Sequence, residues 1–241
     1  MFETVLYSKK GAIANIVLNR PNEVNAFNVQ MRDDLYQALE AVRDDPDVRV
    51  AIVSGAGDRG FCAGADLTEF GTAPSQVIAR NVRWERDLWR LFQIAGKPLI
   101  AAVHGYVIGS GVEIACLCDL RIASEDAVFR MPETALGMVP AAGGTQTLPR
   151  VVGVGRALDV LLTGRQVPAP EAKRMGLVHR VLARDELMPE AQRLADVMAS
   201  LDPDAVSAAR TAIVEGMDLP LDQGLALERR LAARMPVSRQ A

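Results

Sequence analysis

The fold is decided by the stretch Lys97-Pro98-Leu99-Ile100-Ala101-Ala102-Val103-His104-Gly105-Tyr106-Val107-Ile108-Gly109-Ser110-Gly111-Val112-Glu113. Its apolar residues 99–103 lie between a proline and a glycine, a pattern typical of a short buried strand. The small residues that follow leave backbone N–H groups available for an anion, especially where they open a helix. We therefore expect a strand, a small-residue loop and a short helix over residues 112–118, as in α/β proteins.

A second stretch of the same kind is Phe61-Cys62-Ala63-Gly64-Ala65-Asp66-Leu67. It comes after another apolar run, residues 48–53, which ends at Gly55. Both small-residue stretches are therefore expected at strand ends, where α/β proteins build their sites. Two such loops predict an oxyanion hole with two N–H donors.

Repeated strand, loop and helix patterns extend over the chain as far as about Asp185. The predicted strands are residues 5–7, 13–18, 48–53, 99–103, 120–123 and 128–129, and the predicted helices are residues 28–44 with Asn28 as N-cap, 78–92, 112–118, 145–152 and 156–162. Beyond Asp185 only helices are predicted, near residues 186–200, 204–215 and 221–234. The expected organisation is an α/β core over residues 1–185 and a C-terminal helical region over residues 186–241.

Composition excludes several classes of protein. The chain has 241 residues, 49% of them hydrophobic, with a formal net charge of -3. Its arginines are scattered, so no nucleic-acid partner is expected. It has no long apolar span and no secretory signal pattern, so we expect no membrane partner and a cytoplasmic location. The three cysteines contain no CxxC pair, so we expect free thiols and no metal site.

Two glutamates are candidates for acid–base chemistry. Glu113 comes three residues after Ser110, on the same face of the predicted helix, and Glu133 precedes the apolar residues 135–139. Two carboxyl groups in one dry pocket would raise the pKa of one of them, which supplies a general acid beside a general base. The alternative for each glutamate is a surface or salt-bridged role.

Two other functional classes are disfavoured. Residues 55–60 match G-x-G-x-x-G, but the glycines do not open a long helix, as a dinucleotide site requires. His104 and His179 are the only histidines. Because the chain has no G-x-S-x-G motif, we expect both histidines to be structural and disfavour a serine hydrolase.

At these residues the chain resembles the enoyl-CoA hydratase/isomerase family, the crotonase superfamily. The resemblance extends from Ala12 to about Arg234. The motifs that carry it are Arg20-Pro21 with Asn25-Ala26, residues 61–67, residues 97–106 through to Cys118-Asp119, residues 129–133, residues 142–146, and residues 161–165 with Gly176-Leu177-Val178. It implies a crotonase-like spiral of ββα units, a C-terminal helical trimerisation region, an acyl-CoA thioester substrate in fatty acid metabolism, and a homotrimer or hexamer.

The resemblance also implies roles for individual residues. The backbone N–H groups of Ala65 and Ser110 would form the oxyanion hole, and Ser110 stands where the family more often has glycine. Glu113 would accept a proton from water as it adds to a trans-2-enoyl-CoA, and Glu133 would deliver a proton to the α-carbon. Contacts to substrate or CoA are implied for Asn25, Ala26, Ala63, Asp66, Leu67 and Ala141. No metal and no redox cofactor are implied.

Other reactions stay open at this stage. The main rival is an enoyl-CoA double-bond isomerase, which needs one glutamate, and relatives with the same hole decarboxylate, dehalogenate or cleave carbon–carbon bonds. A non-catalytic acyl-CoA-binding subunit is a rival from another class, because Ala141 replaces a glycine common in hydratases and the C-terminal region is short for the family. The length and branching of the acyl group are not specified.

Overall fold

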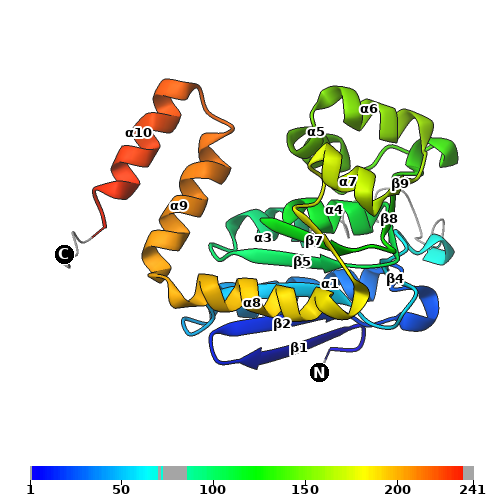
Figure 1. Cartoon of the computed structure of the whole chain (residues 1–241), viewed down its shortest axis with the longest axis horizontal. Coiled ribbons are helices and arrows are strands. Elements are labelled where there is room, and N and C mark those ends of the chain that lie inside the picture. Colours follow the sequence, from blue (N-terminus) through cyan, green and yellow to red (C-terminus); the bar gives the residue numbers. More distant parts are fainter. Residues whose placement is uncertain (1, 70–71, 73–85, 236–241) are drawn as a thin grey trace.

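The computed structural model describes residues 2–69, 72 and 86–235 (Figure 1). Its larger sheet has six strands in the order β1 (Val5–Lys10), β2 (Ile13–Leu18), β3 (Val50–Gly55), β5 (Leu99–Val103), β7 (Leu120–Ser124) and β10 (Arg180–Leu182). Only the β1–β2 hairpin is antiparallel. The central strands β3 and β5 are buried along nearly their whole length and are mostly apolar, because both faces of the parallel sheet are covered.

The smaller sheet has four strands in the order β4 (Gly60–Cys62), β6 (Tyr106–Ile108), β8 (Val128–Arg130) and β9 (Val167–Pro168). The chain alternates between the two sheets, since β3 leads to β4, β5 to β6, and β7 to β8. Strands β4, β6 and β8 are parallel. This alternation is the spiral of ββα units that the resemblance implied.

The helices between these turns begin largely where the sequence predicts. In α1 (Val29–Asp44) the side chain of Asn28 accepts a hydrogen bond from Met31 N at 2.8 Å, which confirms Asn28 as the N-cap. Helix α4 is Ser110–Leu117 and α3 is Leu88–Ile94. Residues 73–85, where the sequence predicts most of a longer helix, lie outside the described residues.

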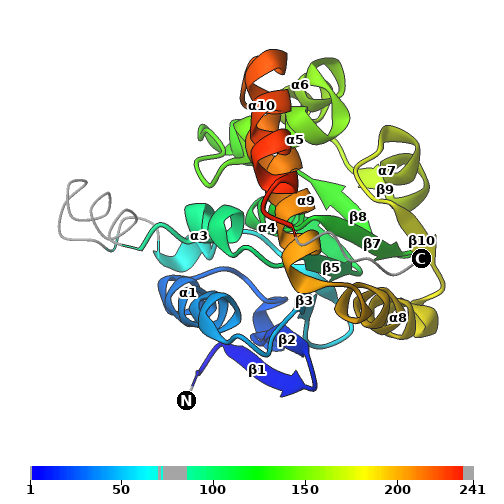
Figure 2. The same cartoon turned by 90° about the vertical axis from the view of Figure 1, so that its left-hand side faces the viewer.

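The larger sheet is covered by helices on both faces, and one of these helices comes from the region after residue 185. Helices α1 and α8 (Leu187–Ser200) lie on opposite sides of the larger sheet (Figure 2). Leu187, Ala191 and Leu194 of α8 are buried in a cluster with β-strand side chains such as Ile52. Helix α8 is therefore a layer of the core, although the sequence assigns it to the C-terminal helical region.

The remaining helices lie above the sheets and beyond α8. Short helix η3 (Glu133–Leu136) leads to α5 (Gly144–Val152), α6 (Val154–Thr163) and α7 (Ala169–Met175). Three further short helices are single turns: η1 (Pro21–Glu23), η2 (Leu67–Glu69) and η4 (Arg184–Glu186). Helices α9 (Pro203–Gly216) and α10 (Leu221–Ala232) pack on each other as a hairpin that stands up from one end of α8 (Figure 1). Arg210 anchors α9, since its Nε lies 2.9 Å from both carboxylate oxygens of Asp119.

Candidate active site

Three neighbouring strands of the smaller sheet each end just before a predicted site residue. Ala65 follows β4, Ser110 follows β6 and Glu133 follows β8. Because these strands are parallel and adjacent, their carboxyl ends meet at one edge of the sheet. Both loops therefore lie at strand ends, as the sequence predicts, but the strands are β4 and β6 of the smaller sheet, which come after the predicted strands at residues 48–53 and 99–103.

The first loop, which follows β4 and includes residues 63–67, presents the N–H of Ala65. The carbonyl of Gly64 accepts a hydrogen bond from Phe27 N at 2.8 Å, and Asp66 N donates to Phe27 O at 2.9 Å. In a planar trans peptide the C=O and N–H groups point in opposite directions, so the Ala65 N–H points away from Phe27. Ala65 is exposed, and within residues 2–69, 72 and 86–235 its N–H has no protein acceptor.

The second loop presents the N–H of Ser110, the first residue of α4. An N–H in the first turn of a helix has no intrahelical acceptor, and the helix dipole makes this end positive. The loop is fixed by Gly109, whose N–H donates to Arg130 O at 2.9 Å and whose φ is +49°. Ser110 itself is buried, which keeps this donor in a low-dielectric setting.

The two loops are in contact. A β-carbon built on Gly64 would lie 3.8 Å from Gly109 Cα, and one built on Gly109 would lie 3.6 Å from Gly64 Cα. The donors at Ala65 and Ser110 each follow one of these glycines directly. The arrangement brings two N–H donors from separate turns of the spiral beside each other, as an oxyanion hole requires.

Glu113 is buried one turn into α4, with 2% of its surface exposed. Its Oε1 atom accepts hydrogen bonds from Ala142 N at 3.1 Å and Gly144 N at 2.9 Å. These donors belong to the loop that opens α5, so two N–H dipoles stabilise negative charge on the carboxylate. The resemblance implied a contact to the substrate or CoA for Ala141, which precedes these two donors in the same loop. In the structure Ala141 is exposed, and its neighbour Ala142 makes the contact.

Glu133 has the opposite environment. Burial raises the pKa of its carboxyl group above the ordinary value. Its Oε2 atom is buried, and it is the one such side-chain atom without a hydrogen-bond partner in the described part of the chain. A buried oxygen in this state is costly unless a ligand, a water molecule or protonation satisfies it. Glu133 therefore has the chemistry of a general acid.

The side chain of Asn25 has a structural role. Its side chain is fully buried, and its Oδ1 accepts from Arg20 N at 2.9 Å. Its Nδ2 donates to Ala56 O at 2.9 Å and to Gly60 O at 3.0 Å. The side-chain amide thus joins residues 20–27 to the start of β4.

The other predicted ligand contacts lie around the first loop. Ala26 and Ala63 are half-buried, and Leu67 is exposed. Asp66 is engaged with the protein: its Oδ2 lies 2.8 Å from Arg20 Nη1, and its Oδ1 accepts from Thr68. The Arg20-Pro21 motif does not reveal Arg20 as the partner of Asp66, because the two residues are far apart in sequence.

The two histidines bond to the protein backbone, and the cysteines are free thiols, as the sequence predicts. His104 lies 3.0 Å from Gly57 O through Nε2, and His179 Nδ1 accepts from Arg121 N. The three cysteines are free, and burial raises the pKa of Cys62 to about 12 and that of Cys116 to about 11.

Among the described residues no group of three metal-ligating side chains comes together. No helix in the same residues is long and apolar enough to cross a membrane.

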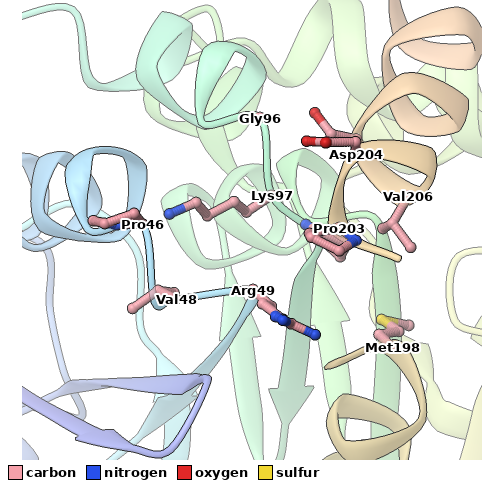
Figure 3. A pocket seen from close by; sticks show the side chains of 11 residues that line it. Pro46, Val48, Arg49, Gly96, Lys97, Met198, Pro203, Asp204 and Val206 are labelled. Atoms are coloured by element: carbon pink, nitrogen blue, oxygen red, sulfur yellow. The ribbon is translucent and has the colours of Figure 1, made fainter. Parts of the chain in front are cut away.

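A cavity of about 250 Å³ lies at the other end of the larger sheet (Figure 3). It is lined by residues that precede β3 and β5, among them Arg49 and Lys97, and by Asp204 of α9. The Lys97 ammonium donates to the carbonyls of Val42 and Asp45, so it is already engaged. This cavity is separate from the oxyanion loops, which follow the carboxyl ends of strands.

Comparison with known proteins gives a consistent result. The sequence model of the family described as enoyl-CoA hydratase/isomerase matches residues 8–240. The crotonyl-CoA hydratase of Syntrophomonas wolfei is 37% identical over 227 residues, which cover 94% of this chain and 87% of that protein. The short-chain-enoyl-CoA hydratase of Clostridium acetobutylicum is 38% identical over 224 residues, which cover 93% and 86%.

Solved structures agree with this result. The crystal structure of an enoyl-CoA hydratase from Bacillus anthracis matches with a TM-score of 0.91 and 35% sequence identity. The match covers 96% of this chain and 90% of that one. The spiral and the C-terminal helices are therefore shared with that protein over nearly the whole chain.

Proposed function

Because the chain belongs to the enoyl-CoA hydratase/isomerase family, we propose that it is an enoyl-CoA hydratase, which adds water to a trans-2-enoyl-CoA to give a 3-hydroxyacyl-CoA. The observation that carries this proposal is the contrast between two glutamates at one pair of loops. Glu113 receives two backbone hydrogen bonds, whereas Glu133 is half-buried and its buried Oε2 atom has no hydrogen-bond partner among the described residues. Hydration needs a base and an acid together, and these environments supply both.

The oxyanion hole activates the substrate. The thioester oxygen accepts hydrogen bonds from the N–H groups of Ala65 and Ser110. These donors withdraw electrons from the conjugated double bond and stabilise the enolate that forms as water attacks. Both donors are backbone groups, so the Ser110 side chain is not required for this role.

The glutamates move the protons. Glu113, as a carboxylate, takes a proton from water while the water oxygen bonds to the β-carbon. Glu133, in the protonated form that burial favours by raising its pKa, gives its proton to the α-carbon. The product has gained one OH and one H. A proton then passes from Glu113 to Glu133, directly or through solvent, to restore the starting state.

The same proposal assigns the contacts to CoA. Ala26 and Ala63 lie toward the adenine end, Leu67 beside the first loop, and the N–H of Ala141 toward the attacking water. Their half-buried or exposed positions at the edge of the first loop and before α5 support this assignment. Hydration transfers protons and water but no electrons, so the reaction needs no redox cofactor, and the backbone donors take the place of a metal ion.

We also assign a homotrimer or a hexamer as the working form. An apolar cavity of about 470 Å³ lies between η3, α5 and α6, bordered by Leu158 and Leu162. The α9–α10 hairpin exposes Ile213, Met217 and Leu221. A soluble monomer rarely exposes so much apolar surface at two places, which favours contact with further copies of the chain.

The test is hydration of crotonyl-CoA, followed as loss of the ultraviolet absorbance of the conjugated thioester. Glu113→Gln and Glu133→Gln should each lose about 100-fold to 10,000-fold in kcat, the usual contribution of a general acid or base. Glu171→Gln is the matched control. Glu171 is on α7, away from the loops, and pairs with Arg165, which precedes that helix. No hydration by the wild-type chain at any acyl length would overturn the proposal.

The rival isomerase is separated by a second substrate. A 3-enoyl-CoA should be converted slowly or not at all if hydration is the function. Faster conversion of 3-enoyl-CoA than hydration of crotonyl-CoA, retained in one of the two glutamine variants, would assign the chain as an isomerase instead.

A further inference from the structure

We propose that the ion pair between Arg20 and Asp66 is a positioning device that orients the Ala65 N–H in the oxyanion hole. This inference rests on the proposed function. It gives Asp66 a role different from the ligand contact that the sequence suggested.

Arg20 connects two segments that are separate in sequence. Its Nη1 donates to Ala26 O at 2.6 Å and to Asp66 Oδ2 at 2.8 Å. Its backbone is held as well, because Arg20 N donates to Asn25 Oδ1 and Asn25 N donates to Arg20 O. The guanidinium therefore extends from a fixed point and joins the 25–27 segment to the residue after Ala65.

Asp66 is fully engaged on its side of the pair. Its Oδ1 accepts from Thr68 N at 3.1 Å and from Thr68 Oγ1 at 2.7 Å. These bonds and Arg20 hold the pKa of Asp66 below its ordinary value. The side chains of Arg20 and Asp66 are only 18% and 11% exposed, so solvent screens the pair less than a surface pair. Asp66 cannot rotate without loss of several bonds.

The position of Asp66 determines the position of Ala65. The backbone of Phe27 is bonded on both sides of Ala65, to Gly64 O and from Asp66 N. Arg20 adds side-chain contacts to the same two segments, at Ala26 O and Asp66 Oδ2. If the segments separate, the Gly64 carbonyl loses Phe27 and the Gly64–Ala65 peptide can turn. The Ala65 N–H would then turn away from the thioester oxygen.

The pair also has an electrostatic effect on the hole. Asp66 directly follows the residue that donates to the developing oxyanion. An unpaired carboxylate there would repel that negative charge. Arg20 neutralises it, so loss of Arg20 harms the oxyanion in two ways, through geometry and through charge.

The test compares Asp66→Asn, Arg20→Gln and the double variant with wild type in crotonyl-CoA hydration. Each single variant should lose about 10-fold to 100-fold in kcat, as for a modest displacement of a catalytic group. KM should stay within about twofold, because the contact acts on the transition state. The double variant should be no worse than the poorer single variant, since one interaction is removed in each.

The control variant is Arg43→Gln, because Arg43 also pairs with an aspartate, Asp44, but lies at the end of α1. It should keep the wild-type kcat. A second readout is the infrared stretch of a carbon-13 labelled thioester carbonyl in bound butyryl-CoA, which cannot be hydrated. Binding to the wild-type chain should lower its wavenumber, and binding to Asp66→Asn should lower it less, because one donor is misplaced.

The outcomes separate this inference from the proposed function. If wild type does not hydrate crotonyl-CoA, the proposed function fails, while the carbonyl shift still tests the pair. If wild type is active and Asp66→Asn keeps its kcat and its carbonyl shift, the positioning role is wrong. A higher KM with an unchanged carbonyl shift would also overturn it, since that result indicates a direct CoA contact. Arg20→Lys, which keeps the charge, should fall between wild type and Arg20→Gln.

Discussion

Glu133 lies against Gly109, so closely that a β-carbon on Gly109 would stand 2.6 Å from Glu133 Oε1. This contact links Glu133, the proposed general acid, to the start of α4, where Ser110 is the first residue. Gly109 therefore has two constraints, a φ of +49° and a neighbour that leaves no room for a side chain. The position of Glu133 depends on the absence of one methyl group.

Gly109→Ala should accordingly damage activity more than its backbone strain explains. We expect a loss of at least about 100-fold in kcat, because displacement of a catalytic group by about 1 Å can cost that much. Gly137→Ala is the matched control: Gly137 has φ +70°, but a β-carbon there meets nothing within 4 Å. Equal kcat values for the two variants in the crotonyl-CoA assay would contradict the contact.

The Ser110 donor can be removed without removal of the helix. Proline is tolerated at the first position of a helix, because the N–H there has no helical partner. Ser110→Pro should lower kcat about 100-fold to 1000-fold, the usual effect of one oxyanion donor. Ser110→Ala keeps the N–H and should stay within about threefold of wild type. Similar kcat values for both variants would show that the backbone N–H is not a donor to the substrate.

Glu133→Gln should stabilise the folded chain at neutral pH although it inactivates the enzyme. Burial raises the folded-state pKa of Glu133 above its ordinary value of 4.5, so the folded chain holds this proton more tightly than the unfolded chain. Below that ordinary value both states are protonated, and the shift has no effect. As the pH rises from there through the raised pKa, wild type loses free energy of unfolding, and the glutamine variant does not.

The size of this effect should be about 0.5 to 2 kcal/mol in the free energy of unfolding, as for other stabilising changes at active sites. Urea unfolding at several pH values measures it. The kcat of wild type should fall over the same pH range, because the protonated acid is required. A difference in stability that does not grow with pH would exclude the titration of Glu133 as its cause.

Charge placed on the exposed apolar surface should reduce the assembly. Leu162 at the cavity of α6 and Met217 after α9 are 69% and 79% exposed. Leu162→Asp and Met217→Asp should each give a smaller mass by light scattering, since an interface cannot bury an unpaired charge cheaply. Val197→Asp on α8 is the control, with 50% exposure and no place in the cavity. A wild-type chain that is monomeric at micromolar concentration would refute the assembly.

The sequence predicts the long elements well because their signals are local. The N-cap at Asn28, the strand before Gly105 and the helices of the C-terminal region are set by neighbouring residues. The smaller sheet is different. Its strands have two or three residues, too few for any periodic pattern, and they are stabilised by pairing with distant turns of the chain.

The residues of the site also differ in whether their role can be predicted from neighbouring residues or depends on distant parts of the chain. Glu113 and Glu133 are candidates from their sequence context, the resemblance implies Ala65 and Ser110 as donors, and the structure brings the loops of Ala65, Ser110 and Glu133 together. For Asn25 the sequence does not indicate the structural bonds that its side chain makes. Its amide in fact bonds to carbonyls 31 and 35 residues away. The partners of Glu113, Ala142 N and Gly144 N, are backbone groups that no side-chain motif specifies.

The alternation between two sheets has a consequence for folding. Ala65, Ser110 and Glu133 come from three successive coils of the spiral, each closed by its own short strand. A chain in which one coil is unformed lacks a donor or the acid, so a half-folded intermediate has no partial activity to display. Recovery of hydration during refolding should therefore lag behind recovery of helical signal and report the closing of the last coil.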